Sequence, residues 1–386
     1  MNSVERHKAR RARREAKRAA KKLTAAQNYT IEQVADIDVL WKAVKRSRKG
    51  VGWKASVQKY CMHALRNITQ VRRTLLAGES VHKGFHNFIL WDNGKLRHIT
   101  STKFEERVVD KAYTQVALIP ALTPTFIRAN TANTKGRGTA DAHRIITKDL
   151  VNFFSEYGTD GYILLLDFSN FFGSLVHAVV KSYIVDKIYD PVLLSHIYTH
   201  IDACCDGSIG LGLGSEPNQV CAVAYPSRID HHVIEMFNVH AYGRYMDDIY
   251  VIDHDKSKLL KVLTRIEELC RSMGLTLNPR KIKLVKLSHG FTFLKRKYHL
   301  TKTGRVIKRP NRAKITKQRQ KLKKLYYLYE AGEISFEQVE SSYYSWKGAQ
   351  KRINSRKTIY SMDRLFTELF ERSQNDTGRT ALRDCN

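Results

Sequence analysis

The chain has 386 residues, and its 67 Lys and Arg against 37 Asp and Glu give a formal net charge of +30. Such an excess of positive charge favours a phosphate backbone as partner. No apolar run approaches the length that spans a bilayer, and the first residues lack the apolar segment of a secretory signal. We therefore expect a cytoplasmic protein whose six cysteines are reduced thiols.

A basic arm opens the chain. Residues 4–22 hold ten Lys and Arg among alanines, a composition that favours a helix with no apolar face to bury. Such an arm is either a solvated tail or a helix ordered by bound nucleic acid, and the overall charge favours the second interpretation. The candidate nucleic-acid contacts are Arg10, Arg11, Arg13, Arg14, Lys17 and Arg18.

Helices and then a hairpin are predicted next. Apolar residues recur at helical spacing over residues 31–76, broken by Gly50 and Gly52, which predicts two or three helices. From Phe85 to Ile99, apolar residues flank Asp92-Asn93-Gly94, which predicts a hairpin with an Asn-Gly turn. Lys95 and Arg97 lie on this hairpin, where basic residues are also typical of an ordinary soluble edge.

Three acidic residues form the most informative pattern. Tyr162–Leu166 is a short buried-strand run that ends in Asp167. In HAYGRYMDDIYVID (residues 240–253), period-2 apolar residues surround Asp247 and Asp248, which predicts a hairpin with the acids at its tip. A plain acidic turn is the alternative. Carboxylates in apolar surroundings are costly unless they hold a cation, so we favour a site for two divalent metals about 4 Å apart, which serves phosphoryl transfer.

The last third of the chain is helical and basic. A helix is predicted over Ser257–Met273, ending at Gly274, and Lys281 follows it in a basic segment. Further helices are expected over Arg312–Leu328 and 336–370. From Ser373 onward the chain is polar and expected to fray, which leaves no room for an RNase H, endonuclease or maturase domain.

These segments together resemble the reverse transcriptases of bacteria and phages. The resemblance covers about residues 84–300 and follows the order of the family's motifs. They stand here as GKLRHITSTKFEERVVDKA (94–112), NTKGRGTADAHR (133–144), LLLDFSNFFGSL (164–175), GLGLGSEPNQ (210–219), YMDD (245–248), GLTLNPRK (274–281) and FTFLKRKY (291–298). Several ordered motifs are far more specific than any one of them.

The resemblance implies an α+β fold of the right-hand polymerase type. It has fingers, a palm with an antiparallel sheet and a helical thumb. The expected domains are a basic arm (1–30), N-terminal helices and fingers (31–160), a palm with the catalytic motifs (161–300), a thumb (301–372) and a polar tail (373–386).

The resemblance also implies roles for single residues. Asp167, Asp247 and Asp248, with the backbone carbonyl of Phe168, would hold two Mg²⁺ ions, with Mn²⁺ as a substitute. The implied nucleotide-binding residues are Lys95, Arg97, Phe172, Gly214, Gln219 and Lys281, with Phe172 as the gate against the ribose 2′-hydroxyl. The implied template and primer contacts are Tyr245, Met246, Arg137, Phe293 and Leu294, and Arg137 could instead grip phosphates. Phe172 as a core residue, and Lys281 as a surface lysine, are the alternatives.

One motif departs from the commonest reverse transcriptases. Their QGxxxSP pattern is here LGSEPNQ (residues 213–219, the template box), which is similar to the LGxxxSQ form of diversity-generating retroelement enzymes and of several defence-associated bacterial lineages. Asn218 could bond a base or sugar, or could be a buried packing cap. We expect a stand-alone enzyme of antiphage defence that makes DNA from dNTPs on a structured non-coding RNA template. A mutagenic retroelement enzyme is the alternative, and an inert RNA-binding scaffold is disfavoured by the three aspartates.

Overall fold

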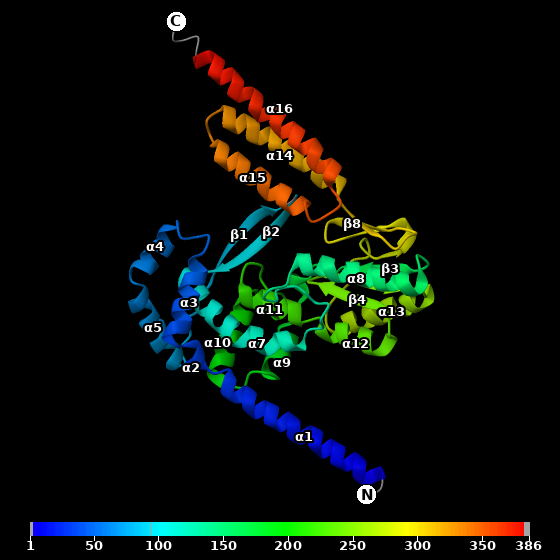
Figure 1. The fold of residues 1–386 in the computed structure, drawn as a ribbon. Helices are drawn as coiled ribbons and strands as arrows, with labels where there is room; N and C mark the ends of the chain where they lie inside the picture. Colours follow the sequence, from blue (N-terminus) through cyan, green and yellow to red (C-terminus); the bar gives the residue numbers. More distant parts are fainter. Residues whose placement is uncertain (1–2, 93, 382–386) are drawn as a thin grey trace. The chain divides into compact units, whose positions relative to one another are not determined.

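The computed structural model describes residues 3–92 and 94–381 (Figure 1). The chain is rich in helix and contains three sheets. It divides into two compact units. Unit 1 comprises Met1–Ala142, Leu166–Val251 and Ser257–Ile282, and unit 2 comprises His143–Leu165, Ile252–Lys256 and Lys283–Asn386. Both units therefore combine segments that are distant in the sequence.

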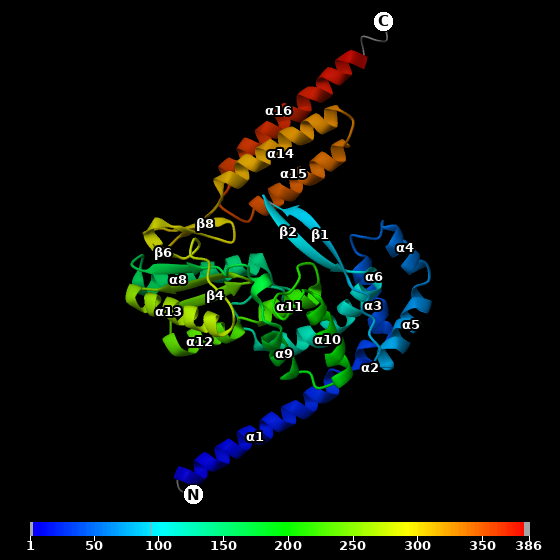
Figure 2. The same ribbon diagram turned by 180° about the vertical axis from the view of Figure 1, so that it is seen from behind.

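Unit 1 begins with helices. The predicted arm is helix α1 (Ser3–Asn28), which runs as one straight element away from the helices that follow it (Figures 1 and 2). Residues 31–76 form four helices where two or three were predicted: α2 (Ile31–Val34), α3 (Ile37–Arg48), α4 (Ala55–Met62) and α5 (Ala64–Leu76). The extra break arises because Asp36 caps α3, its side chain accepting the Val39 N–H at 3.0 Å.

The predicted hairpin is confirmed. Strands β1 (Phe85–Asp92) and β2 (Lys95–Thr102) pair antiparallel, with Asp92 opposite Lys95. We call this pair the fingers hairpin. Gly94 has φ +82°, as a hairpin turn of this kind requires, whereas Asn93 lies outside the described residues.

Helices make up most of the remainder of unit 1. They are α6 (Phe104–Tyr113), a π-helical turn (Thr114–Leu118), α7 (Ile119–Leu122), two 3₁₀ turns (Thr123–Thr125 and Phe172–Ser174), α9 (His177–Val185), α10 (Pro191–Ala203), α11 (Glu216–Ala224), α12 (Ser227–Phe237) and α13 (Lys256–Ser272). Helix α13 and the positive φ of Gly274 confirm the helix predicted to end there. Helix α8 (Thr139–Tyr157) runs from unit 1 into unit 2.

A four-stranded sheet carries the predicted acidic positions. Its strands are β3 (Tyr162–Leu166), β4 (Ala241–Tyr245), β5 (Asp248–Asp253) and β6 (Lys283–Lys286), in the order β4-β5-β3-β6. Strand β3 is buried over its last four residues and pairs antiparallel with β6. The predicted strand before Asp167 and the predicted hairpin around Asp247 are therefore both present.

Unit 2 contains a second sheet and a helical bundle. The sheet consists of β7 (Phe291–Phe293), β8 (Arg296–Leu300) and β9 (Val306–Pro310), after a 3₁₀ turn (Leu287–His289). Helices α14 (Arg312–Glu330), α15 (Phe336–Gln350) and α16 (Arg356–Ala381) lie side by side in both ribbon views (Figures 1 and 2). Their shared core consists of Leu322, Val339, Tyr343, Met362 and Phe370.

Three further observations bear on the sequence analysis. Helix α16 extends past residue 372, the expected end of the thumb, to Ala381, and residues 382–386 lie outside the description. Within the described part of the chain, no helix is long and apolar enough to cross a membrane. The described cysteines are free thiols: Cys61, Cys204, Cys205, Cys221 and Cys270.

Candidate active site

Asp167 lies directly after β3, with only 4% of its surface exposed. The segment that follows α13 holds this position: the Asn278 N–H donates to the Asp167 carbonyl at 2.8 Å, and the Ser169 N–H donates to the Thr276 carbonyl at 2.7 Å. From the same segment, the Lys281 ammonium donates to Asp167 Oδ2. The backbone therefore fixes Asp167 while Lys281 offsets its charge.

Asp247 lies in the turn between β4 and β5, and Asp248 follows it directly. Met246 has φ +56°, a left-handed conformation that is uncommon for a side chain of this kind, and Asp248 is the first residue of β5. Burial raises the pKa of Asp247, and the negative charge of Asp167 raises it further, whereas Lys281 and Arg97 act in the opposite direction.

Lys281 is part of the same electrostatic cluster. Burial acts to lower its pKa, but the hydrogen bond to Asp167 and the charges of Asp247 and Asp248 outweigh burial and raise it above its usual value. The structure thus brings together Asp167, Asp247, Asp248 and Lys281, all within unit 1. Arg97 of the fingers hairpin is near enough for its charge to act on the pKa of Asp247.

A buried ion pair lies beneath the turn that carries Asp247, and sequence reasoning missed it. The side chains of Asp230 in α12 and Arg244 in β4 are completely buried and bond through Nε and Nη2 at 2.7–3.0 Å. Arg244 Nη1 also donates to the carbonyl of Met246 at 3.0 Å, and Tyr242 donates to Asp230 at 2.7 Å. Arg244 therefore holds the turn that presents Asp247. The available signal was an arginine inside a buried strand, which requires a partner.

The donor chemistry of this cluster fits a hard divalent cation. Within the described ranges, no group of three or more His, Cys, Asp or Glu side chains lies close enough together to hold a metal ion as it stands. Asp167 nevertheless binds a cation, the Lys281 ammonium, and the pKa of Asp247 is raised by burial and by the negative charge of Asp167. Carboxylate oxygens are the ligands that Mg²⁺ prefers. A divalent ion on Asp167 would compete with Lys281.

Removing Lys281 should therefore change metal affinity. Lys281→Met is expected to tighten Mn²⁺ binding by the metal-free protein on the order of tenfold, ~1.4 kcal/mol, because a competing cation is lost. Electron paramagnetic resonance titration with Mn²⁺ measures this change. Lys283→Met, at an exposed lysine two residues away, is the matched control and should bind Mn²⁺ as the wild type does. Unchanged or weaker binding by Lys281→Met would contradict the competition.

The fingers hairpin and the template box contact each other. The Thr100 N–H donates to the Leu213 carbonyl at 2.7 Å. Gly214 has φ +126°, and a Cβ there would lie 2.8 Å from the Thr100 carbonyl, so its close approach is to β2. Arg97 Nε bonds Asp92 Oδ2 at 3.0 Å, and Lys95 is exposed.

The two polar residues at the end of the template box differ. Asn218 is completely buried and donates to the Gly212 carbonyl at 2.9 Å, which is the packing-cap interpretation of this residue. Gln219 is exposed. Its contact with a nucleotide stays a prediction.

The aromatic residues after Asp167 also differ in burial. Phe168 and Phe171 are buried and stack with ring centroids 5.2 Å apart, whereas Phe172 is half-buried and meets Phe171 edge-on at 5.6 Å. Phe172 is thus the most accessible of the three. Its role as sugar gate, and the Phe168 carbonyl as a metal ligand, stay predictions.

Phe172→Val should relax the choice of sugar. If Phe172 collides with a ribose 2′-hydroxyl, the smaller side chain should raise incorporation of ribonucleotides relative to deoxyribonucleotides roughly 10- to 100-fold, the range that one steric contact supplies. The measurement is the ratio of kcat/KM for each rNTP and its dNTP. Phe171→Leu, which removes buried packing next door, should leave that ratio unchanged. Equal use of both sugars by the wild type would contradict the gate.

The remaining predicted residues lie in varied surroundings. Arg137 donates to Asp141 Oδ2 at 2.7 Å and to the carbonyls of Asn130 and Arg128, so its guanidinium braces its own loop. Tyr245 is half-buried. Phe293 is buried in β7 of unit 2, and Leu294, at φ +45°, forms the turn before β8. In α1, the side chain of Arg18 lies outside the description, and the following are exposed: Arg10, Arg11, Arg13, Arg14 and Lys17.

Part of the chain matches a known protein family. Residues 220–299 match the family model described as reverse transcriptase (RNA-dependent DNA polymerase). No curated protein matches the chain. The matched segment includes Asp247, Asp248 and Lys281, and it ends within β8, one residue before the end of that strand. This segment is therefore similar to the reverse transcriptase family, and the similarity supports RNA-directed DNA polymerase activity.

Proposed function

We propose that this protein is an RNA-directed DNA polymerase that extends a primer by two-metal nucleotidyl transfer. The observation that carries the proposal is the cluster of Asp167, Asp247, Asp248 and Lys281. Two segments about 80 residues apart in the sequence supply its carboxylates, which interact electrostatically with one another and with Lys281. The match of residues 220–299 to the reverse transcriptase family supports the same chemistry.

In the proposed reaction the residues of unit 1 have separate tasks. The three aspartates would hold the metal ions, with the Phe168 carbonyl as a further ligand. The chemistry that the ions would supply is activation of the primer 3′-hydroxyl and charge stabilisation of the leaving pyrophosphate. Arg97 offsets negative charge near Asp247 and would do the same for a triphosphate. Lys281, once released from Asp167, is a protonated group that could donate to the departing phosphate.

Primer extension tests the proposal directly. The purified chain, given a DNA primer on an RNA template with dNTPs and Mg²⁺, should lengthen the primer, and chelation of Mg²⁺ should stop the reaction. Extension that continues without divalent ions, or no extension on any RNA template, would contradict the proposed function.

A basic groove in unit 2 supports a nucleic-acid partner. It encloses about 1590 Å³ between the exposed face of the β7–β9 sheet and the first residues of α14 and α16. That is larger than the roughly 300–1,000 Å³ of typical small-molecule pockets. No Asp or Glu lines it among the described residues, whereas seven cations do: Lys297, Arg305, Arg309, Arg312, Lys351, Arg356 and Lys357. A phosphate backbone suits such a lining.

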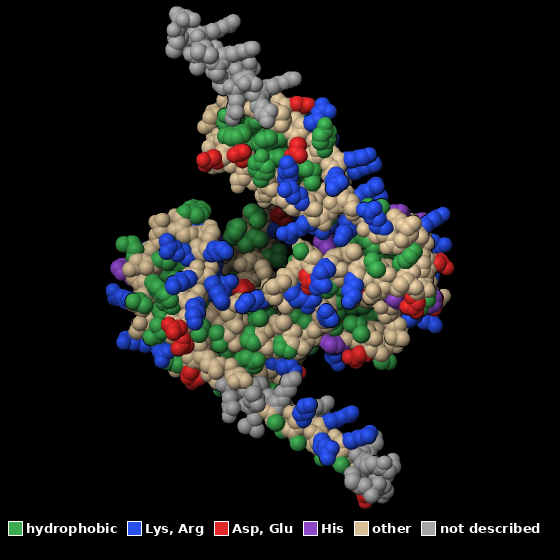
Figure 3. Space-filling view, in the orientation of Figure 1, with side chains coloured by type: hydrophobic (Ala, Val, Ile, Leu, Met, Phe, Trp, Pro, Cys, Tyr) green, Lys and Arg blue, Asp and Glu red, His purple; other side chains and the backbone are tan. Residues whose placement is uncertain are grey.

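We extend the proposal to a dedicated structured RNA as the template, in the setting of antiphage defence. The exposed arginines of α1 support an RNA partner, and Lys and Arg side chains are spread over α1 and over the visible faces of both units (Figure 3). The template box is similar to that of several defence-associated lineages, and diversity-generating retroelement enzymes, the alternative, share it. Sequencing the nucleic acid that co-purifies with the protein tests it: a single structured RNA species supports the proposal, and unselected cellular RNA contradicts it.

Neutralising α1 should weaken RNA binding and its dependence on salt. Replacing Arg10, Arg11, Arg13 and Arg14 by Gln is expected to lower the slope of log K against log salt by up to about 0.9 per lost phosphate contact. Binding isotherms of the full chain at several salt concentrations measure the slope. The same four positions replaced by Lys retain the charge and should retain the slope. Identical slopes for the Gln variant and the wild type would show that α1 is a solvated arm.

A further inference from the structure

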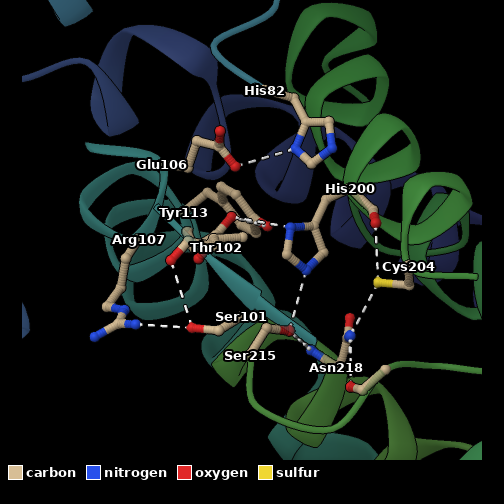
Figure 4. A network of polar contacts seen from close by, with 12 residues as sticks. His82, Ser101, Thr102, Glu106, Arg107, Tyr113, His200, Cys204, Ser215 and Asn218 are labelled. Atoms are coloured by element: carbon tan, nitrogen blue, oxygen red, sulfur yellow. Dashed lines mark hydrogen bonds and ion pairs between the residues drawn. The ribbon is translucent and has the colours of Figure 1, made fainter. Parts of the chain in front are cut away.

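A buried polar network connects the fingers hairpin to the template box (Figure 4). Its centre is His200, in the last turn of α10, with 3% of its surface exposed. His200 Nδ1 lies 3.1 Å from Asp110 Oδ1, and His200 Nε2 lies 3.1 Å from Ser215 Oγ. One imidazole ring thus joins α6 to the residue that begins α11.

On the hairpin side, Asp110 gathers the contacts. Its carboxylate accepts the hydroxyl of Thr102, the last residue of β2, at 3.1 Å, and the hydroxyl of Tyr113 at 2.8 Å. Asp110 is itself buried, with 7% of its surface exposed. Because a buried carboxylate without bonds is costly, these contacts fix the end of β2 relative to His200.

On the box side, Ser215 and Asn218 complete the network. Ser215 Oγ caps α11 by accepting the Asn218 N–H at 3.3 Å. The Asn218 side chain then donates to the Gly212 carbonyl at 2.9 Å and to Cys204 Sγ at 3.0 Å, and Cys204 donates to the His200 carbonyl at 3.0 Å. The template box is therefore tied back to the helix that carries His200.

The hairpin and the box also meet directly, at Thr100. Its N–H donates to the Leu213 carbonyl at 2.7 Å, and Cβ atoms added at Gly212 and Gly214 would lie 2.5 and 2.8 Å from Thr100 atoms. The two segments are closely packed here, so a small shift of the hairpin or of the box would break the hydrogen bond between Thr100 and Leu213. The hairpin carries Lys95 and Arg97, and the box carries Gln219.

We propose that His200 is a positioning residue that holds the template box against the fingers hairpin and thereby sets the affinity for the incoming dNTP. The inference rests on the proposed polymerase function. Among the described residues, His200 bonds Asp110 and Ser215 and not Asp167, Asp247 or Asp248, so it acts through Asp110 and Ser215.

The charge state of His200 agrees with this role. Burial acts to lower its pKa, but Asp110 outweighs burial and raises the pKa of His200 to about 10. The ring is therefore a cation at neutral pH, and both its nitrogens donate, one to the Asp110 carboxylate and one to Ser215 Oγ.

His196 supplies a matched control. It lies one turn earlier on α10, is also buried at 9%, and lines the same small cavity as His200. Its Nε2 has no hydrogen-bond partner among the described residues. A substitution at His196 therefore removes a buried imidazole of the same helix without cutting the link between Asp110 and Ser215.

The test compares His200→Gln with His196→Gln in the full chain. A neutral glutamine amide cannot replace the charge-assisted bond between the His200 imidazolium and Asp110, and the loss of that bond is worth roughly tenfold in an equilibrium. His200→Gln should raise KM for dNTPs roughly tenfold with a much smaller change in kcat, and His196→Gln should change neither. Hydrogen exchange gives an independent readout: the Thr100 amide should exchange faster in His200→Gln than in His196→Gln or the wild type.

Each outcome bears on the proposal. Equal KM changes in the two variants, or unchanged Thr100 exchange in His200→Gln, would overturn it. If His200→Gln does not fold, Ser215→Ala removes the acceptor instead and should produce the same KM change and the same exchange of Thr100, and its absence would overturn the proposal too. A wild type that incorporates no dNTP means that the proposed function has failed, whereas the exchange comparison still decides whether His200 holds the contact.

Discussion

Asp247→Asn is expected to abolish nucleotide incorporation while raising the thermal stability of the metal-free protein. The amide keeps the shape of the side chain but removes the charge that would hold a divalent ion, and metal catalysis contributes several kcal/mol, so the rate should fall by about 10³-fold or more. Stability should rise because burial and Asp167 both disfavour the ionised form of Asp247, as its raised pKa records.

The sign of the stability effect follows from that raised pKa. A folded-state pKa above the unfolded value means that folding favours the protonated carboxyl, so this group stabilises the fold at low pH and loses that contribution as pH rises through the folded pKa. At neutral pH the buried charge is therefore a cost. Asparagine removes this cost at every pH, and the gain in Tm should be largest above the folded pKa.

Primer extension and thermal melting, each with and without Mg²⁺, measure both effects. Mg²⁺ should raise the Tm of the wild type, because an ion that binds only the folded state stabilises it, and should have little effect on Asp247→Asn. Asp206→Asn, at an exposed acid of the same unit, is the control and should behave as the wild type. Normal incorporation by Asp247→Asn under Mg²⁺ would contradict the role of Asp247 in metal binding. A lower metal-free Tm would contradict the destabilising effect of its charge.

The sequence predicted the elements around the aspartates because short-range patterns determine them. Tyr162–Leu166 is apolar throughout and forms a buried strand, and alternation around Asp247 produces a hairpin whatever the rest of the chain does. The helix before Gly274 and the fingers hairpin follow from local turn chemistry in the same way. The proximity of Asp167 and Asp247 is implied by the family resemblance, since no local pattern shows that these two residues interact.

Contacts between distant elements could not be predicted. Gly214 is a close-approach glycine as expected, but its neighbour is the Thr100 carbonyl, which lies 114 residues earlier in the chain. No spacing rule reveals that pairing without the fold. Asn218 satisfies a carbonyl of its own loop. The partner of Lys281 is Asp167, because the segment after α13 bonds the backbone of Asp167 and of Ser169. Such pairings depend on tertiary packing, which period and propensity do not encode.

Disrupting the buried pair of Asp230 and Arg244 should have the largest effect on stability. Asp230→Asn leaves the completely buried Arg244 guanidinium without its counter-charge, and breaking a buried pair in this way costs about 3–5 kcal/mol in the free energy of unfolding. Chemical denaturation measures this loss. Arg265→Gln, which removes a partly exposed pairing with Glu268, is the control and should cost no more than about 1 kcal/mol.

A triple variant separates this structural effect from positioning of the turn that carries Asp247. Asp230→Leu, Tyr242→Phe and Arg244→Met together replace the polar cluster by apolar side chains of similar size, and such replacements are often neutral or stabilising, so most of the lost stability should return. The carbonyl of Met246 nevertheless loses its donor, and Met246 holds the left-handed conformation that presents Asp247. Incorporation should therefore stay at least roughly tenfold below wild type in the stable triple variant, because small displacements of a catalytic group are costly in rate. Recovery of both stability and incorporation would show that the ion pair only supports the fold, and that Asp247 keeps its place without the bond from Arg244.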